Sequence, residues 1–558
     1  MKRNVCFLLF VLLAFYSCKQ HPVYDSIIRN GVIYDGNGGD PYKADIAING
    51  DTVAFIGDLK DAKANKESDA KGMAVAPGFI NMMGHSEESL IQDGRSQGDI
   101  RQGVTTEIFT ESSMGPYNAK MKQQQQDGQG DIKYKVGWNT LGEYMNFLEK
   151  KGISCNIATF VGTGAVRQYV IGEDNKAPTP AQLDSMKLLV RQAMQEGALG
   201  VTNALIYPPD FFAKTDELIA LSKEAAKYGG TYDSHMRSEG NKLYEAVEEL
   251  ITISKEANIP AEICHLKAAG KGNWGKMDSV IRRVERARKE GLDITADMYT
   301  YVAGATGMTS AFPPSLQDGG FGKLWQRLHD PVIRKQMATA MNTNATDWEN
   351  LYYGSEGATH VLLLSFKQDS LKKFTGKTLA EVAVIRGKTP EETAMDLIIQ
   401  DSTRVGVAYF MINEDNVKKQ VALPWVSFGS DEASYTTEGV FLKSNAHPRA
   451  YGNFARVLGK YSRDEKMLTI KDAIKKLANL PAKHLKLLKR GALKVGNYAD
   501  IVIFDPATIT DHATYDKPHQ YATGVIDVFV NGVQVLKDGT HTGATPGRFV
   551  KGPGYKAN

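Results

Sequence analysis

The chain has 558 residues, of which 42% are hydrophobic and 23% are charged, and its formal net charge at pH 7 is +3. A single hydrophobic core rarely serves a chain of this length, so we expect two or more domains. The small net charge, without any basic run along the sequence, excludes the electrostatic pattern of a nucleic-acid-binding protein.

The first residues have the pattern of an export signal. A basic dipeptide precedes the apolar run VCFLLFVLLAF, which is too short for a comfortable membrane span. Ser17-Cys18 resembles a bacterial lipoprotein cleavage site, so residues 1–18 are predicted to be a signal peptide and Cys18 to be lipidated. The mature protein is then periplasmic, or tethered to a membrane of a bacterial envelope. Plain secretion and an uncleaved anchor are the alternatives, because two aromatic residues precede Ser17.

Both ends of the mature chain are rich in short strands. Residues 23–77 contain apolar runs separated by dipeptides typical of tight turns, including Asn-Gly at 30–31. Residues 486–558 show the same pattern, with a second Asn-Gly at 531–532. We expect the two segments to form one small β-sandwich domain.

The segment between them repeats a strand and an amphipathic helix. Apolar runs end at His235, His265 and Asp297, with helical patterns between them. A repeat near 30 residues predicts βα units around a parallel sheet. The length of residues 78–485 favours an α/β fold of the TIM-like (β/α)8 barrel type over a doubly wound open sheet. Residues 310–375 break the rhythm, and we expect an inserted lid or subdomain there, near the mouth of the barrel.

Histidines and carboxylates stand at the ends of several of these apolar runs. They are His85, Glu111, His235, His265 and Asp431. The active site of a β/α barrel lies at the carboxyl ends of its strands, so these side chains are expected to converge. Imidazole and carboxylate groups bind divalent metals such as zinc. A single histidine at a strand end is more often structural, and the metal hypothesis therefore depends on the whole set.

Several longer motifs resemble those of one enzyme family. The stretches APGFIN…GH, QGVTTEI, GALGVTNALIYPP, DSHMRSEG, CHLKAAGKGNWGK, FGSDEAS and HPRAYGNFARVLGKY are similar to motifs of the D-aminoacylase family. These enzymes are the N-acyl-D-amino-acid deacylases of the amidohydrolase superfamily. The resemblance covers nearly the whole mature chain. It implies a β/α barrel with a small β-sandwich, a zinc site, and hydrolysis of linear amides in N-acyl-D-amino acids or short D-residue peptides.

The resemblance also implies roles for single residues. His235 and His265 match the metal-binding histidines of successive strands, and Asp431 matches the catalytic aspartate. His85 matches the second histidine of the family's His-x-His pair. Three further residues match groups that hold the substrate carboxylate or lie near it: Lys267, Arg449 and Tyr299. Each of these three also has a structural interpretation, as a partner of the barrel rim, a loop brace and a packing residue, respectively.

Two positions depart from the family pattern. Met83 replaces the first histidine of the pair, and Glu111-Ser112 stand near the place of a metal-binding cysteine. A thioether is a poor zinc ligand beside imidazole and carboxylate. A carboxylate binds zinc well, so Glu111 is the expected replacement. The rival carboxylate Glu107 lies in the middle of its strand and is expected to be a barrel-wall or surface residue.

We therefore predict one tightly bound zinc ion on Glu111, His235 and His265, completed by water. His85 becomes a weaker ligand, or a polar group beside the substrate. The substrate is a small N-acyl amino acid or a short peptide, and residue spacing leaves the oligomeric state open.

Two other functions remain open on the residues alone. A cyclic amidase of the hydantoinase or dihydroorotase type shares the fold, but usually needs a metal-bridging lysine on the fourth strand. The segment 156–162, taken as that strand, has no lysine. A non-catalytic lipoprotein on an amidohydrolase scaffold is the second alternative, because the histidine and the cysteine are missing.

Overall fold

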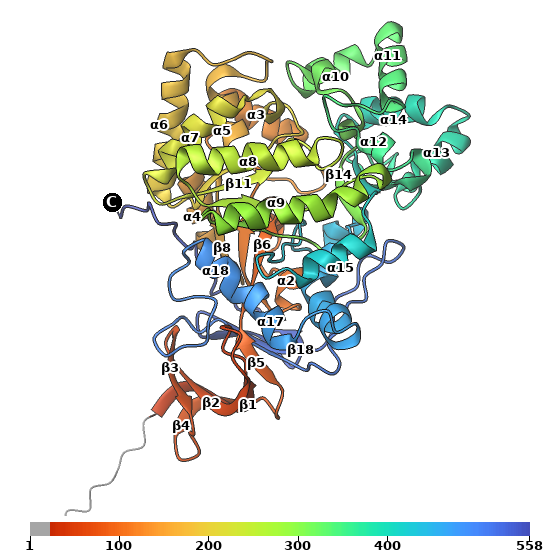
Figure 1. Cartoon of the computed structure of the whole chain (residues 1–558). Coiled ribbons are helices and arrows are strands. Elements are labelled where there is room, and N and C mark those ends of the chain that lie inside the picture. The colour runs from red at the N-terminus through yellow and green to blue at the C-terminus, as the bar shows by residue number, and fades with distance from the viewer. Residues whose placement is uncertain (1–22, 558) are drawn as a thin grey trace, which may run out of the picture.

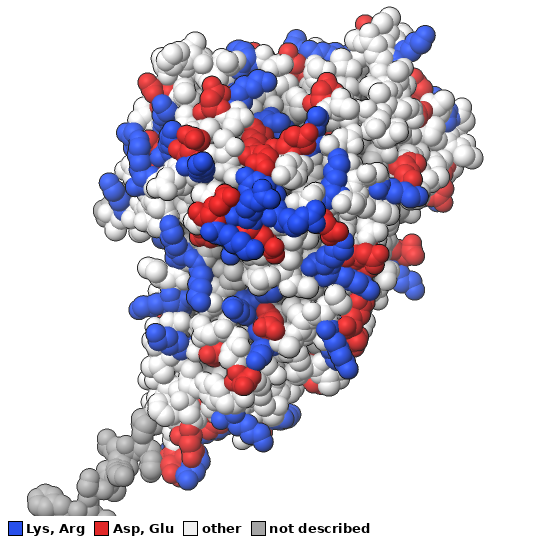
Figure 2. Space-filling model, in the orientation of Figure 1, with Lys and Arg blue, Asp and Glu red and all other residues white. Residues whose placement is uncertain are grey.

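The computed structural model describes residues 23–557, which form a β-rich unit, a barrel and an inserted subdomain (Figure 1). The predicted signal peptide and Cys18 lie outside the described residues. Within that range, none of the helices has the length and apolar character needed to cross a membrane. Over the face displayed in Figure 2, lysine and arginine side chains are interspersed with aspartate and glutamate.

One nine-stranded sheet joins the two ends of the chain, as predicted. The strand β5 pairs antiparallel with β17, and this pair connects the N-terminal and C-terminal halves. Apolar side chains from both halves, such as Val75 and Ile501, share one core. The strands are β1 (Val23–Ile33), β2 (Tyr42–Asn49), β3 (Thr52–Gly57), β4 (Lys63–Asp69), β5 (Ala74–Pro77), β17 (Ile501–Phe504), β18 (Val525–Val530), β19 (Val533–Lys537) and β20 (Thr540–His541).

The predicted β/α barrel is confirmed, with eight strand positions. Strands β8 and β9 occupy one position, because only Phe160 separates them, and they pair with β7 and β10 respectively. An irregular segment closes the ring, since Val426 bridges Ala296 of β13 and Glu432 bridges Gly84 of β6. The strands are β6 (Phe79–Gly84), β7 (Val104–Phe109), β8 (Asn156–Thr159), β9 (Val161–Gly162), β10 (Gly200–Ala204), β11 (Thr231–His235), β12 (Ala261–Ile263) and β13 (Ile294–Ala296).

This strand order corrects one assignment made from the sequence. Residues 156–162 form the third position of the barrel, and the fourth is β10. The connection from β7 to β8 contains two helices and is longer than one βα period, so the sequence leaves room there for a strand that the structure does not have. The sequence of β10, GVTNA, also contains no lysine, so the argument against a lysine-bridged metal pair is unchanged.

Amphipathic helices alternate with these strands and cover the barrel (Figure 1). In α8, Leu243, Val247 and Leu250 form a buried stripe, and the helix ends at Asn258 in the left-handed conformation, with φ 50°. A capping box made by Thr179 begins α6. The helices are α1 (Glu87–Gln92), α2 (Gln97–Ile100), α3 (Ala119–Gly128), α4 (Leu141–Lys151), α5 (Thr163–Ile171), α6 (Pro180–Glu196), α7 (Thr215–Ala226), α8 (Leu243–Ala257) and α9 (Met277–Lys289).

The inserted subdomain follows β13 and is longer than the predicted 310–375. Its antiparallel sheet has the order β14-β16-β15. The first and last of these strands in the sequence, β14 and β16, therefore pair although about one hundred residues separate them. Local sequence patterns do not predict which distant strands pair, so the sequence did not indicate the full length of the insertion. The elements are β14 (Ala303–Gly307), α10 (Phe321–Arg327), α11 (Pro331–Met341), α12 (Leu351–Gly354), β15 (Val361–Ser365), α13 (Leu379–Arg386), α14 (Pro390–Asp401), β16 (Gly406–Phe410) and α15 (Glu414–Ala422).

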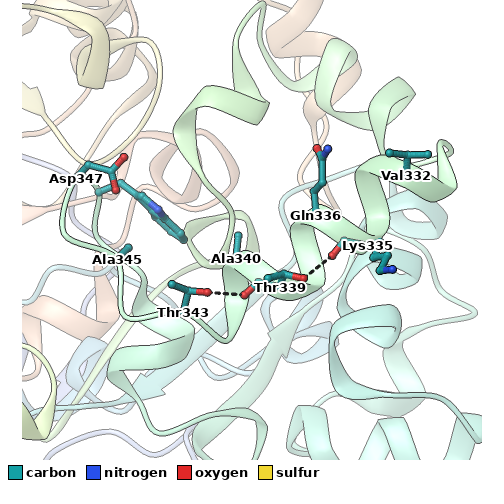
Figure 3. A pocket seen from close by; sticks show the side chains of 9 residues that line it. Val332, Lys335, Gln336, Thr339, Ala340, Thr343, Ala345 and Asp347 are labelled. Carbon is teal, nitrogen blue, oxygen red and sulfur yellow. Dashed lines mark hydrogen bonds between the residues drawn. The ribbon is translucent and has the colours of Figure 1, made fainter.

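Two further features complete the fold. An open hollow of about 540 Å³ lies along α11 and the loop after it (Figure 3), and no residue at a barrel strand end lines it. The last helices are α16 (Arg449–Arg456), α17 (Ile470–Ile474) and α18 (Leu480–His484). Ala482 of α18 packs with Ile80 and Ile108 of the first two barrel strands. This part of the barrel is therefore a packed core and not a pore.

Candidate metal centre and active site

The strand ends bring three predicted side chains to one point. Glu111 follows β7, His235 ends β11 and His265 follows β12. Glu111 Oε1 lies 2.7 Å from His235 Nδ1 and 2.8 Å from His265 Nε2. The two imidazole nitrogens are 3.0 Å apart. Three potential ligand atoms from three strands therefore face each other, as the sequence predicted.

This donor set fits a zinc ion. Catalytic zinc sites have three protein ligands, often histidines with one carboxylate, and keep a fourth position open. Neighbouring ligands of a tetrahedral zinc ion are roughly 3.3 Å apart, close to the separations within this cluster. His235 and His265 are 4% and 2% exposed. Burial alone would raise the pKa of Glu111, but its contacts with His235 and His265 hold the pKa well below the usual range.

The backbone at this point is strained. Glu111, His265 and Asp431 all have positive φ angles, of 63°, 31° and 50°. Residues other than glycine rarely adopt this conformation, and such strain clusters at functional sites. Each of the three residues directly follows or lies near the end of a barrel strand, so the strain turns its side chain toward the mouth.

A second cluster shares Glu111 with the first. His85 Nε2 lies 3.1 Å from Asp431 Oδ1 and 3.8 Å from Glu111 Oε2. Asp431 Oδ2 is 2.9 Å from Arg449 Nη1. Burial lowers the pKa of His85, but the hydrogen bond to Asp431 and the charge of Glu111 outweigh it and raise the pKa to about 9. The structure thus places His85 and Asp431 next to the first cluster, on the side of Glu111 away from His235 and His265.

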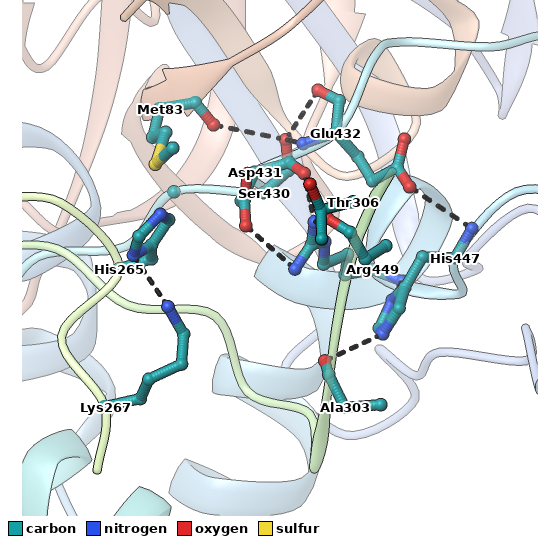
Figure 4. Close-up of polar contacts among 12 residues, drawn as sticks. Met83, His265, Lys267, Ala303, Thr306, Ser430, Asp431, Glu432, His447 and Arg449 are labelled. Atoms are coloured by element: carbon teal, nitrogen blue, oxygen red, sulfur yellow. Dashed lines mark hydrogen bonds and ion pairs between the residues drawn. The ribbon is translucent and has the colours of Figure 1, made fainter. Parts of the chain in front are cut away.

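Met83 lies next to this second cluster and contributes no ligand nitrogen. It is fully buried, and its backbone oxygen accepts a hydrogen bond from the amide of Asp431 at 2.9 Å (Figure 4). The side chain packs against Gly429, where a Cβ would come within 2.6 Å of the Met83 Cβ. The second cluster therefore has a single imidazole.

The residues predicted to hold the substrate carboxylate are buried and already have partners. Lys267 Nζ lies 2.6 Å from Glu239 Oε1. It also lies 2.7 Å from His265 Nδ1, a contact that Figure 4 shows. The Arg449 guanidinium stacks over the Tyr299 ring at 4.3 Å, besides its contact with Asp431. Among residues 23–557, the Tyr299 hydroxyl and the Arg449 Nε have no hydrogen-bond partner. Both groups are buried polar atoms beside the second cluster.

Sequence reasoning missed Glu239 and Glu349. Glu239 lies four residues after His235, and its Oε1 is 2.9 Å from His265 Nδ1. Glu349 comes from the inserted subdomain, and its Oε2 accepts hydrogen bonds from the amides of Glu239 and Gly240. The DSHMRSEG motif contained a signal for Glu239, but no local signal pointed to Glu349.

Two other residues have supporting positions. Glu107 is fully buried in the middle of β7 and belongs to neither cluster, so it is a barrel-wall residue. His447 accepts the Arg449 amide at Nδ1, at 3.1 Å, and its Nε2 lies 3.0 Å from the Ala303 oxygen (Figure 4). Burial is the main reason that the pKa of His447 is well below its usual value. The neutral ring thereby links β14 of the insertion to the active site.

Comparison with known proteins agrees with the geometry. The model of the amidohydrolase family matches residues 66–536 of this chain. The chain belongs to the amidohydrolase family. The predicted membership of the amidohydrolase superfamily, and with it the prediction of a hydrolase, is thus confirmed.

Relatives of this amidohydrolase include proteins of known activity. The D-aminoacylase of Alcaligenes xylosoxydans xylosoxydans is 29% identical over 530 residues, which are 94% of this chain and 97% of that one. A solved D-aminoacylase structure, 29% identical, has a TM-score of 0.78 and covers 95% of this chain and 100% of its own. Its binuclear metal center is described as showing one-metal activation and second-metal attenuation.

A second solved relative of this amidohydrolase contains zinc. It is the N-acyl-D-glutamate deacylase from Bordetella bronchiseptica, in complex with zinc and a phosphonate inhibitor that mimics the tetrahedral intermediate. It is 26% identical, with a TM-score of 0.78, and covers 95% of this chain and 100% of its own. The resemblance therefore extends over both β-rich ends as well as the barrel.

Proposed function

We propose that this amidohydrolase is a zinc-dependent N-acyl-D-amino-acid deacylase with one tightly bound zinc ion. It hydrolyses the linear amide of an N-acyl-D-amino acid, or of a short D-residue peptide, to a carboxylate and a free D-amino acid. The observation that carries the proposal is the convergence of Glu111, His235 and His265 beside the Asp431 carboxylate. Relatives that match nearly the whole chain act on N-acyl-D-amino acids.

The protein residues divide the work of hydrolysis. A divalent zinc ion held by the three ligands lowers the pKa of water and polarises the substrate carbonyl group. Asp431 acts as the general base: it accepts a proton from the attacking water and returns it to the leaving amine. Burial would raise the pKa of Asp431, but Arg449 and His265 hold it below the usual range. The carboxylate is thus ionised and ready to accept that proton.

The substrate carboxylate has a defined place in this proposal. Arg449 uses part of its guanidinium on Asp431, and its Nε is still free within the described chain. The Tyr299 hydroxyl offers a second donor, and its ring supports the guanidinium. A carboxylate bound there is held by a charge-assisted hydrogen bond. Lys267, which contacts Glu239 and His265, adds a positive charge near this place without being proposed to contact the substrate.

His85 and Met83 account for the single tight metal ion. The second cluster has one imidazole, its Asp431 carboxylate is already paired with Arg449 at 2.9 Å, and its Glu111 is shared with the first cluster. The thioether of Met83 adds no good zinc ligand. His85 instead donates to Asp431 at 3.1 Å, which orients the base toward the reacting water. A second metal ion on His85, Glu111 and Asp431 is then weak.

The protein is further proposed to act in the bacterial cell envelope. The residues 1–18 have the pattern of an export signal, and Cys18 that of a lipidated first residue. Labelling with a fatty acid should mark the native protein, and the Cys18→Ala variant should lose both the label and membrane association. A native protein without label would contradict the tether.

One experiment tests the activity. Purified protein with added zinc is assayed against N-acetyl-D- and N-acetyl-L-amino acids, D-dipeptides and hydantoins. We expect hydrolysis of the N-acyl-D-amino acids and close to one zinc ion per chain. Turnover of hydantoins alone would favour a cyclic amidase. If the protein shows no turnover of any substrate and binds no metal, the result would favour a non-catalytic scaffold.

A further inference from the structure

In both histidines proposed to bind zinc, the ring nitrogen that does not face Glu111 is directed toward one carboxylate, that of Glu239. Glu239 is 2% exposed, and both of its oxygens point at histidines. Its Oε1 lies 2.9 Å from His265 Nδ1, and its Oε2 lies 3.7 Å from His235 Nε2. The His235 Nε2 is buried and has no hydrogen-bond partner within residues 23–557. The inner nitrogens of the same rings face Glu111.

The proton on His265 decides whether its inner nitrogen can bind a metal. A neutral imidazole carries one proton, so a metal on Nε2 requires the proton on Nδ1. Lys267 Nζ, at 2.7 Å, can only donate to Nδ1 and therefore favours the opposite tautomer. Glu239 can only accept, and it stabilises the proton on Nδ1. The two partners of Nδ1 thus have opposite effects on metal binding.

We propose that Glu239 is a positioning residue, which holds the imidazoles of His265 and His235 in the orientation and tautomer that bind zinc. The inference rests on the proposed function, because it assumes the metal on Glu111, His235 and His265. Carboxylates that accept from the outer nitrogen of a metal-binding histidine raise its basicity and fix its ring. Lys267, at 2.6 Å from Glu239, balances the charge of this buried carboxylate.

The surrounding structure holds Glu239 from two sides. Its backbone oxygen accepts from the Ala269 amide at 2.7 Å, and its amide donates to Glu349 at 2.7 Å. Ala269 follows β12, whereas Glu349 belongs to the inserted subdomain. The insertion thereby fixes the loop that carries the carboxylate, and one function of the insertion is to support the metal site.

The experiment compares variants that differ only at Glu239. Lys267→Met removes the competing donor and keeps the carboxylate. Glu239→Leu/Lys267→Met removes both members of the buried pair, so no unpaired charge remains. Zinc affinity is measured by competition with a chelator, and the absorption spectrum of cobalt-loaded protein reports the ligand geometry. We expect the double variant to bind zinc roughly 10–100-fold more weakly than Lys267→Met, with a changed cobalt spectrum.

A conservative variant separates hydrogen bonding from packing. Glu239→Gln/Lys267→Met keeps an acceptor oxygen near His265 and should recover part of the affinity. Equal zinc affinities for Lys267→Met and Glu239→Leu/Lys267→Met would overturn the role of Glu239, while the proposed function stands. If Lys267→Met does not fold, the zinc affinities of Glu239→Gln/Lys267→Met and Glu239→Leu/Lys267→Met are compared with each other instead. A native chain that binds no zinc would instead contradict the proposed function itself.

Discussion

The mouth of the barrel has two sides that share Glu111 and otherwise differ. On the side of β11 and β12, two imidazole nitrogens lie within 3.0 Å of each other and of Glu111. On the side of β6 and the closing segment, His85 is the single imidazole, and its partner Asp431 is bound to Arg449. One side concentrates metal ligands, whereas the other pairs a carboxylate with cations.

This difference separates metal binding from general-base catalysis. In a site with two metal ions, the same carboxylate would take part in both. A carboxylate that binds a metal is a weaker base, because the cation withdraws its charge. Asp431 is ionised through Arg449 and oriented through His85, so it need not be a ligand. Met83 keeps a second imidazole away from this side. The comparison predicts that changes on the first side affect metal binding, and changes on the second affect catalysis.

The largest expected effect comes from the residue that both sides share. Glu111→Gln should weaken zinc binding by more than about 100-fold, beyond the range for groups that only support a ligand, and activity should fall with it. The control is Glu107→Gln, a buried carboxylate of the same strand outside both clusters, which should keep its zinc. Zinc content after dialysis measures both. Full retention of zinc by Glu111→Gln would remove this residue from the metal site.

Asp431→Asn should leave the metal and remove the base. We expect kcat to fall roughly 10²- to 10⁴-fold, the usual contribution of general acid–base catalysis, with about one zinc ion still bound per chain. Steady-state kinetics and metal analysis on the same sample test this. If the variant loses its zinc, the two sides of the mouth are not functionally separate.

Met83→His should erase the difference between the two sides. The new imidazole stands beside His85, and together with Asp431 and Glu111 it completes a second set of good zinc ligands. We expect a second, weaker zinc equivalent per chain. Met83→Leu keeps an apolar side chain and should remain at one. A Met83→His protein that still binds one equivalent would show that Met83 is not what limits this side.

The smallest expected effect on the metal and the base is a shift in pH dependence, caused by the cation beside Asp431. Arg449 lowers the pKa of Asp431, so the native base loses its charge only as the pH falls through that low value. Arg449→Met should raise this pKa and move the acidic limb of the kcat/KM profile to higher pH. Zinc content should not change. Because Arg449 also holds the substrate carboxylate in the proposed function, Arg449→Met should in addition lower kcat/KM at every pH. An acidic limb that stays in place would mean that another group sets the charge state of Asp431.

Several features of this protein follow from the sequence alone. The repeat of about thirty residues predicted a parallel barrel, because each unit joins a continuous apolar run, typical of a strand buried on both faces, to a helix that is apolar on one side. The carboxyl ends of parallel strands meet at one edge, so His235 and His265 could be placed together without coordinates. Turn dipeptides at both ends indicated the small β domain in the same local way.

Only the tertiary structure decided the rest. The pairing of β14 with β16, the closing segment near Val426 and the contact of Glu349 with the Glu239 loop join residues far apart in sequence. The sequence predicts that Lys267 holds the substrate carboxylate, and the structure adds a partner that the sequence did not indicate, since Lys267 forms a buried ion pair with Glu239. Local periodicity records whether a side chain is buried. The identity of its partner depends on how distant elements pack, and that carries no local period.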